Sequence, residues 1–377
     1  MSEDRLRVLY ELRLSRGEDA AARAAAVARE QSLELPPGCA PAAVEERFLG
    51  RVERVEPLGR GRARAEISYD PLLVGGEAGQ LLDLLYGHLS MQGDARVAAV
   101  GWPPALLARF PGPRHGVAGV RTRCGAGPDR PLLCAALKPP GLAPAELAER
   151  AYELAAGGVD LIKDDHGHAD QEMAPFAERV ARCQEAVARA HAETGSQTVY
   201  LPHLTGPDVR GRAETAWRAG CEGALVTPLV VGLDTVAALA AAETGLIVMA
   251  HPGLSGAFTA SRGRGVAPEV LLGEVFRLAG ADAVLYPNAG GRFRVSVATC
   301  LAIHQRLRAP LDGIRPAFPA LGGGIDPARL RHWSRRYGPD TIFLVGGGLY
   351  RQGDLRRAAA ELREALERAP RRRSSGC

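Results

Sequence analysis

Lysine is nearly absent from this chain of 377 residues. Lysine and arginine together number 47, and only two of them, Lys138 and Lys163, are lysines. Arginine replaces lysine freely on a solvated surface, but a guanidinium stays charged and cannot supply a nucleophilic or modifiable amine. The two lysines are therefore candidates for nitrogen chemistry.

Other scarcities exclude whole classes of protein. The seven cysteines form no Cys-x-x-Cys pair, and their odd number argues against both a disulfide framework and a zinc knuckle. The most apolar region, 223–250, is interrupted by Pro228, Asp234 and Glu243, so it predicts no membrane span. The first residues become charged at once and include no apolar signal segment. We therefore expect a cytoplasmic protein without a membrane partner.

Charge is also close to balance. The formal net charge is +4, and the arginines are scattered rather than clustered. The one basic run lies in the tail 368–377, where a frayed terminus explains it without a ligand. With 46% hydrophobic and 24% charged residues the composition is that of a globular protein, and we expect no nucleic-acid partner.

The first hundred residues alternate between strand and helix periodicity. The pattern predicts strands at 7–14, 48–57, 62–70 and 95–102, with helices at 18–30 and 78–91. This βαββαβ order is that of a ferredoxin-like α+β domain. The segment 103–119 is rich in proline and glycine and is interpreted as a linker, which divides the chain into domains 1–118 and 119–377.

From Pro131 onward the pattern becomes strand, helix, strand, helix. Eight near-continuous apolar runs predict strands buried on both faces, at 131–139, 159–165, 198–206, 223–232, 246–253, 282–288, 314–324 and 341–348. Each is followed by an alanine-rich helical segment. This number of βα units in this length predicts a closed (β/α)8 TIM barrel, whose active site lies at the C-terminal ends of the strands.

Polar residues collect at those ends. Side chains alternate along a strand, so Lys163 and Asp165 share one face and Asp164 the other, where it is interpreted as a structural carboxylate. Lys163 and Asp165 form either an ordinary salt bridge or, with a carbamate on Lys163, a site for a hard cation. The other strand-end candidates are Lys138, His166, His203, Thr227, His251 and Asn288.

Two glycine triplets end the seventh and eighth predicted strands. Barrels frequently bind phosphate there through backbone N–H groups, and glycine allows the close approach. We expect a phosphate group to bind at Gly322, Gly323, Gly324, Gly346, Gly347 and Gly348. His251 is a candidate proton donor to a substrate hydroxyl. His203 is either a site residue or a buried histidine with satisfied hydrogen bonds.

The ordered motifs "LKPPGLAP", "GGVDLIKDDHG", "PALGGGID" and "FLVGGGLYRQGD" resemble the large subunit of ribulose-bisphosphate carboxylase (RuBisCO). The resemblance implies an N6-carboxylysine at Lys163 that holds Mg²⁺ together with Asp165. It also implies catalytic roles for Lys138 and His251 and phosphate loops at the glycines. Glu30, in "AREQSLE", resembles the glutamate that reaches a neighbouring subunit's site, so a homodimer with intersubunit sites is implied.

Departures from the carboxylase pattern exclude carbon dioxide fixation. The second strand-one lysine is here Pro140, the second metal carboxylate is His166, and the phosphate-binding arginine is Pro252. The segment 285–293 lacks the lysine that polarises CO2. Together with "AHPGLSGAF" and "GGRF", this pattern resembles the RuBisCO-like proteins (the form IV homologues), which retain the enolising half of the chemistry.

The resemblance implies metal-assisted proton transfer on a phosphorylated keto-sugar. The expected enzyme is an isomerase or enolase of the methylthioribulose-phosphate type of methionine salvage. An alternative is a decarboxylase or C–C hydrolase of a 3-oxo sugar-acid phosphate (isoapionate type), which a cationic Arg292 at the mouth would favour. A non-catalytic sugar-phosphate-binding protein is the third possibility. His166 favours a softer divalent cation if it is a ligand, and otherwise it could act as an acid or base.

Overall fold

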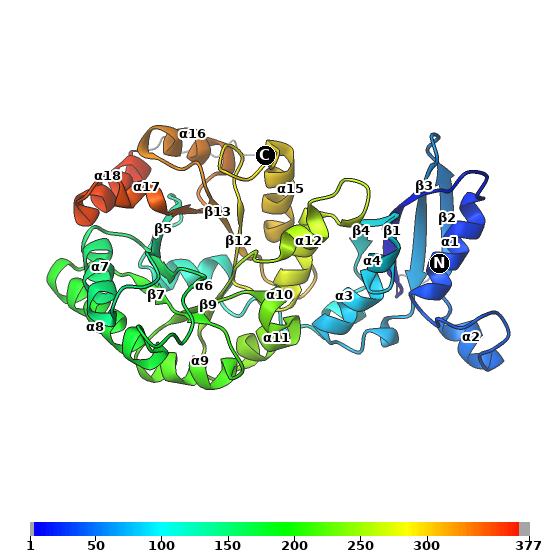
Figure 1. Ribbon diagram of the computed structural model, residues 1–377, viewed down its shortest axis with the longest axis horizontal. Coiled ribbons are helices and arrows are strands. Elements are labelled where there is room, and N and C mark those ends of the chain that lie inside the picture. Colours follow the sequence, from blue (N-terminus) through cyan, green and yellow to red (C-terminus); the bar gives the residue numbers. More distant parts are fainter. Residues whose placement is uncertain (1–3, 369–377) are drawn as a thin grey trace.

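The computed structural model describes residues 4–368, which form a small α+β unit beside a larger barrel (Figure 1). The small unit contains the predicted order β1 (Leu6–Arg13), α1 (Ala20–Glu30), β2 (Arg51–Pro57), β3 (Arg62–Tyr69), α3 (Ala78–Tyr86) and β4 (Ala95–Gly101). Shorter helices α2 (Ala42–Phe48), η1 (Pro71–Leu73) and α4 (Leu89–Gln92) lie between them. The ferredoxin-like domain is therefore confirmed.

The sheet of this unit has the order β11-β4-β1-β3-β2, and β1 pairs antiparallel with both β3 and β4. Alternate residues of β1 are buried, which places one face of the sheet on its helices. The edge strand β11 (Gly265–Val266) comes from the barrel and pairs with β4, so the two units share a sheet. One predicted helix, 78–91, is divided by Gly87 into α3 and α4.

The predicted linker is more ordered than its composition indicates. It contains α5 (Pro104–Leu107) and the start of α6 (Gly116–Arg123), so the division between residues 118 and 119 falls inside α6. Directly after the predicted linker, Val120 in α6 and Cys124 at its C-terminal end pack into the apolar cluster formed by inward-facing strand residues. Proline and glycine here begin short helices rather than prevent them.

The barrel strands are β5 (Leu132–Leu137), β6 (Leu161–Asp164), β7 (Val199–Leu201), β8 (His203–Leu204), β9 (Gly223–Val226), β10 (Ile247–Ala250), β12 (Ala283–Pro287), β13 (Phe318–Gly322) and β14 (Ile342–Val345). β7 and β8 are the predicted third strand, interrupted at Pro202. Their order closes the parallel sheet around the barrel, which confirms the TIM-barrel fold. The prediction for 223–232 was too long, because Pro228 begins a helix directly after the strand.

Helices surround these strands (Figure 1). They are α7 (Pro144–Ala156), α8 (Phe176–Thr194), α9 (Val209–Arg218), α10 (Pro228–Val231), α11 (Leu233–Ala241), α12 (Ser255–Thr259), α13 (Pro268–Val270), η2 (Leu271–Val275), α14 (Phe276–Leu278), α15 (Val297–Arg308), α16 (Pro327–Tyr337), α17 (Gly347–Tyr350) and α18 (Leu355–Glu367). Within residues 4–368, no helix combines the length and apolarity that a membrane crossing requires.

Candidate active site

Lys163 lies near the end of β6 with only 3% of its surface exposed. Its Nζ donates a hydrogen bond to the carbonyl oxygen of Asp164 at 2.7 Å. Burial lowers the pKa of this amine, because the charged form loses its hydration. A buried amine with a lowered pKa is a better nucleophile at neutral pH than a surface lysine.

Asp165 pairs with Lys138 rather than with Lys163. The register of β5 and β6 sets Leu137 beside Asp164, so the next residues, Lys138 and Asp165, also come together. Burial alone would raise the pKa of Asp165, but hydrogen bonds from Lys138 and from the Gly167 N–H (2.9 Å) outweigh it and lower the pKa to about 2. The site therefore holds a fixed carboxylate beside the side-chain nitrogen of Lys138.

The backbone of Lys138 is held by two side chains that the sequence did not single out. The Tyr350 hydroxyl accepts the Lys138 N–H at 2.9 Å and donates to the Ala136 carbonyl at 2.8 Å. Arg150 donates to the Lys138 carbonyl at 2.9 Å. In the sequence, Tyr350 lies two residues after the second glycine triplet. This position was the one feature of the sequence that could have identified Tyr350 as a site residue.

Asp164 faces away from the mouth, as side-chain alternation predicted. Its carboxylate is fully buried, accepts hydrogen bonds from the Tyr200 hydroxyl (2.8 Å) and the His203 N–H (3.1 Å), and pairs with Arg179 at 3.3 Å. Arg179 also donates to the carbonyls of Ala169 and Ala174 at 2.9 Å. This buried network fixes the loop that follows Lys163.

His166 and His251 stack with their ring centroids 4.4 Å apart and their planes inclined by 19°. Burial, followed by the charge of Lys163, lowers the pKa of His251 to about 3. Burial also lowers the pKa of His166. The Gly253 N–H donates to Nδ1 of His251 at 3.1 Å, which leaves the proton of the neutral ring on Nε2.

His203 has partners on both ring nitrogens. Nδ1 donates to the His168 carbonyl at 2.8 Å, and Nε2 lies 3.3 Å from the Thr227 hydroxyl. The ring is 4% exposed, and burial lowers its pKa. His203 is therefore a buried, neutral histidine with a hydrogen-bond partner on each ring nitrogen.

The glycine triplets combine constrained backbone with open space. Gly323 and Gly324 have φ angles of 102° and 65°, and a Cβ on Gly324 would lie 2.7 Å from the Gly290 carbonyl oxygen. A Cβ on Gly346 or Gly347 would meet no heavy atom within 4 Å. The backbone at the start of α17 is thus accessible to a ligand group.

Asn288 is fully buried at the end of β12. The Tyr337 hydroxyl donates to its Oδ1 at 3.1 Å, whereas its Nδ2 has no hydrogen-bond partner within the described chain. Arg292 is exposed in the following loop, with its guanidinium 4.8 Å from the centre of the Phe293 ring. Its charge also contributes to lowering the pKa of His166, after the larger effects of burial and of the charges of Lys163 and Lys138.

Glu30 does not join this cluster in its own chain. It ends α1, a helix of the small unit (Figure 1). Its Oε1 lies 3.5 Å from Nδ1 of His88. The other predicted site residues lie at or after the barrel strands.

The unmodified side chains form no complete metal site. Among residues 4–368, no three His, Cys, Asp or Glu side chains gather as a metal ion requires. Asp165 and His166 are adjacent donors, and a carbamate on the buried Lys163 amine would supply further oxygen atoms. The donor set fits a divalent cation only with that modification.

Comparisons with known proteins identify the family of this chain. Residues 121–369 match the catalytic domain of the ribulose bisphosphate carboxylase large chain. The chain is 41% identical over 354 residues to a 5-methylthioribulose-1-phosphate isomerase of Rhodospirillum rubrum, covering 93% of each chain. It is 36% identical over 321 residues to a 2,3-diketo-5-methylthiopentyl-1-phosphate enolase of Geobacillus kaustophilus, covering 83% of this chain and 76% of that one.

The fold agrees over almost the whole length. A RuBisCO-like protein from Rhodopseudomonas palustris superimposes with a TM-score of 0.88 at 40% identity, covering 99% of this chain and all (100%) of that one. This chain therefore belongs to the ribulose bisphosphate carboxylase large-chain family, among its RuBisCO-like proteins.

Proposed function

We propose that this protein catalyses enolisation of a phosphorylated keto-sugar, as an isomerase or enolase of the methylthioribulose-phosphate type. The observation that carries the proposal is the buried amine of Lys163 beside the Lys138–Asp165 pair, at the mouth of the barrel. The names of the isomerase and enolase relatives support the substrate class.

The glycine loops are proposed to hold the substrate phosphate. The open space before Gly346 and Gly347 leaves room for it, and backbone N–H groups there suit an anion. A phosphate fixed at β13 and β14 places the ketone end of a short sugar above the central residues. Fixing one end in this way gives the reacting carbon a single orientation toward the base.

Two groups are candidates for the base that removes the proton next to the ketone. One is a carbamate oxygen on Lys163, and the other is Nζ of Lys138 in its neutral form. His251 would donate its Nε2 proton to a substrate oxygen and recover it later. Burial keeps the His251 ring neutral at neutral pH. The proposed proton donor is therefore a neutral imidazole, not an imidazolium.

The cation is proposed to be Mg²⁺, held by the N6-carboxylysine at Lys163 and by Asp165, with His166 as a third donor or as an acid or base. A bound divalent cation would offset the negative charge that develops on the enediolate oxygens. Another divalent metal fits better if His166 is a ligand, because imidazole suits softer ions than Mg²⁺.

A second reaction is favoured by one observation. The exposed cation of Arg292 follows β12 at the mouth, where it could hold a substrate carboxylate. The enediolate would then form by decarboxylation or C–C cleavage of a 3-oxo sugar-acid phosphate (isoapionate type). A non-catalytic role in sugar-phosphate binding is the remaining candidate.

We also propose a homodimer that works in the cytoplasm. Glu30 lies in the small unit, apart from its own barrel cluster, and its expected catalytic role therefore requires a second copy. In such a dimer each site would combine one barrel with the partner's small unit.

The test is NMR-monitored exchange of substrate C–H for deuterium after incubation with Mg²⁺ and bicarbonate. Methylthioribulose 1-phosphate, its diketo derivative and a 3-oxo sugar-acid phosphate are compared, with Lys163→Arg as the inactive variant. Exchange or isomerisation that the variant loses supports the proposal. Carboxylate loss or C–C cleavage from the oxo-acid alone supports the second reaction, and binding without turnover supports the third.

A further inference from the structure

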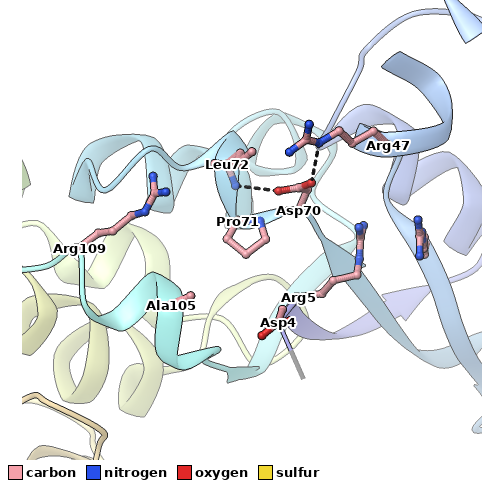
Figure 2. Close-up of a pocket in the computed structure, with 9 residues that line it drawn as sticks. Asp4, Arg5, Arg47, Asp70, Pro71, Leu72, Ala105 and Arg109 are labelled. Atoms are coloured by element: carbon pink, nitrogen blue, oxygen red, sulfur yellow. Dashed lines mark hydrogen bonds and ion pairs between the residues drawn. The ribbon is translucent and has the colours of Figure 1, made fainter. Parts of the chain in front are cut away.

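A pocket lies away from the barrel mouth, at the junction of the small unit and the segment that leads to the barrel (Figure 2). Its volume is about 390 Å³, within the usual range for small-molecule sites. The charged groups that line it are Asp4, Arg5, Arg47, Arg51, Asp70 and Arg109. None of the proposed active-site residues contributes to it.

The pocket has an excess of positive charge. Its four arginines and two aspartates leave a net formal charge of +2. The Asp70 carboxylate is already engaged, because Oδ2 accepts from Arg47 at 3.3 Å and Oδ1 accepts the Leu72 N–H at 2.9 Å (Figure 2). Arg47 is therefore paired with Asp70, and the other three arginines of the lining, Arg5, Arg51 and Arg109, can contact a ligand.

Those three arginines are positioned without carboxylate partners. Arg5 is fixed by hydrogen bonds to Ser68, from Nε to the hydroxyl at 2.9 Å and from a terminal nitrogen to the carbonyl at 3.1 Å. Within the described residues, none of Arg5, Arg51 and Arg109 forms an ion pair. Burial, followed by the charge of Arg51, lowers the pKa of Arg5, and the carboxylates of Asp70 and Glu53 offset these effects only in part.

The rest of the lining is partly apolar. Pro71 and Leu72 form a wall next to Asp70, and Leu72 is 47% exposed although its side chain is large and hydrophobic. A bare inorganic ion would leave this wall in contact with water. A ligand with an anionic end and a small organic body would cover it.

We propose that this pocket binds a phosphomonoester, with its dianionic phosphate between Arg5 and Arg51 and its organic part against Pro71 and Leu72, on the side toward Arg109 (Figure 2). Guanidinium groups match phosphate geometry and form charge-assisted hydrogen bonds with it. Arg5 precedes β1 and Arg51 begins β2, whereas Arg109 lies in the segment between the two units. The bound ester therefore joins the small sheet to the connection that leads into the barrel.

Equilibrium dialysis of the full-length protein with radiolabelled ribose 5-phosphate tests this pocket, with inorganic phosphate as the competitor. The double variant Arg51→Gln/Arg109→Gln removes two exposed guanidinium groups without opening the core. Arg54→Gln is the matched control, since Arg54 lies on the same strand and is exposed but does not line the pocket. Circular dichroism checks that each variant is folded.

The wild type and Arg54→Gln should bind one equivalent of ribose 5-phosphate per chain at the pocket, counted as the difference from the double variant. The double variant should lose the pocket equivalent or bind it about tenfold or more weakly, with turnover at the barrel unchanged. Unchanged stoichiometry and affinity in the double variant would overturn the proposal. Inorganic phosphate should compete more weakly than unlabelled ribose 5-phosphate at the pocket. Equal competition by the two would refute specificity for the ester. Because the barrel is measured separately by turnover, this result does not depend on the proposed enzymatic reaction.

Discussion

His166 stacks on His251 at 4.4 Å between ring centroids, and this contact joins the loop after β6 to the end of β10. His166 occupies the position where the carboxylase pattern has its second metal carboxylate. His166 therefore contacts two groups of the site. Its ring packs against His251, the proposed proton donor, and its Nδ1 lies 3.5 Å from Oδ1 of Asp165. A substitution at His166 should affect both metal affinity and proton transfer.

Replacing His166 with aspartate should separate these two effects. A second carboxylate should raise the affinity for Mg²⁺ roughly tenfold, because this cation prefers oxygen donors. Loss of the stacked ring should lower turnover by freeing His251. Calorimetric titration of the bicarbonate-treated protein with Mg²⁺, beside deuterium exchange, measures both. An unchanged Mg²⁺ affinity would place residue 166 outside the metal site.

Lys138→Arg tests whether Lys138 acts through its amine. The positive charge next to Asp165 is retained, but a guanidinium cannot give up a proton at neutral pH. Exchange should fall by about 10² or more, the usual contribution of a general acid or base. The thermal midpoint should change little, since Lys138 is 36% exposed. Full activity in the variant would mean that Lys138 contributes charge alone.

Gly347→Ala should raise KM for the phosphorylated substrate with little effect on stability. A Cβ at this position meets no protein atom within 4 Å, so it would occupy the space proposed for the phosphate. Gly127→Ala is the control, because its Cβ is equally unobstructed but lies outside the glycine loops. Steady-state kinetics and thermal melts of both variants provide the comparison. Equal KM values would argue against phosphate binding at α17.

Arg179→Met should destabilise the fold strongly. Arg179 and Asp164 have no exposed side-chain surface (0% for both), and removing one partner leaves a buried charge without compensation, at a cost of about 3–5 kcal/mol. Arg182→Met, on the same helix, removes only an exposed pair with Glu178 and should cost less than about 1 kcal/mol. Urea denaturation measures both free energies of unfolding. Similar losses would contradict the buried-network account.

Glu274 should make stability decrease with rising pH. Burial raises its pKa to about 7 from the ordinary 4.5, despite the opposing charge of Arg306 at 3.1 Å. The folded state therefore binds this proton more tightly than the unfolded chain, and the associated stability is lost as pH rises from about 4.5 through 7. Relative to Glu274→Gln, the wild type should lose about 3 kcal/mol across this window. Parallel pH dependences of the two proteins would refute the assignment.

The sequence alone determined the types and order of the principal elements. Period-two alternation and continuous apolar runs are local properties, and they were sufficient to predict the βαββαβ domain and the barrel. The scarcity of lysine alone marked Lys138 and Lys163 as candidate site residues. Side-chain alternation likewise separated Asp164 from its two neighbours.

Only the tertiary structure decided which of these groups meet. The register of β5 against β6 pairs Lys138 with Asp165, and closure of the barrel brings His251 over His166. The pocket lined by Arg5, Arg51 and Arg109 is formed by residues of the small sheet and of a segment that the sequence indicated as a linker. Local periodicity cannot supply such pairings, because each depends on how strands distant in the chain align and on which charges packing removes from water.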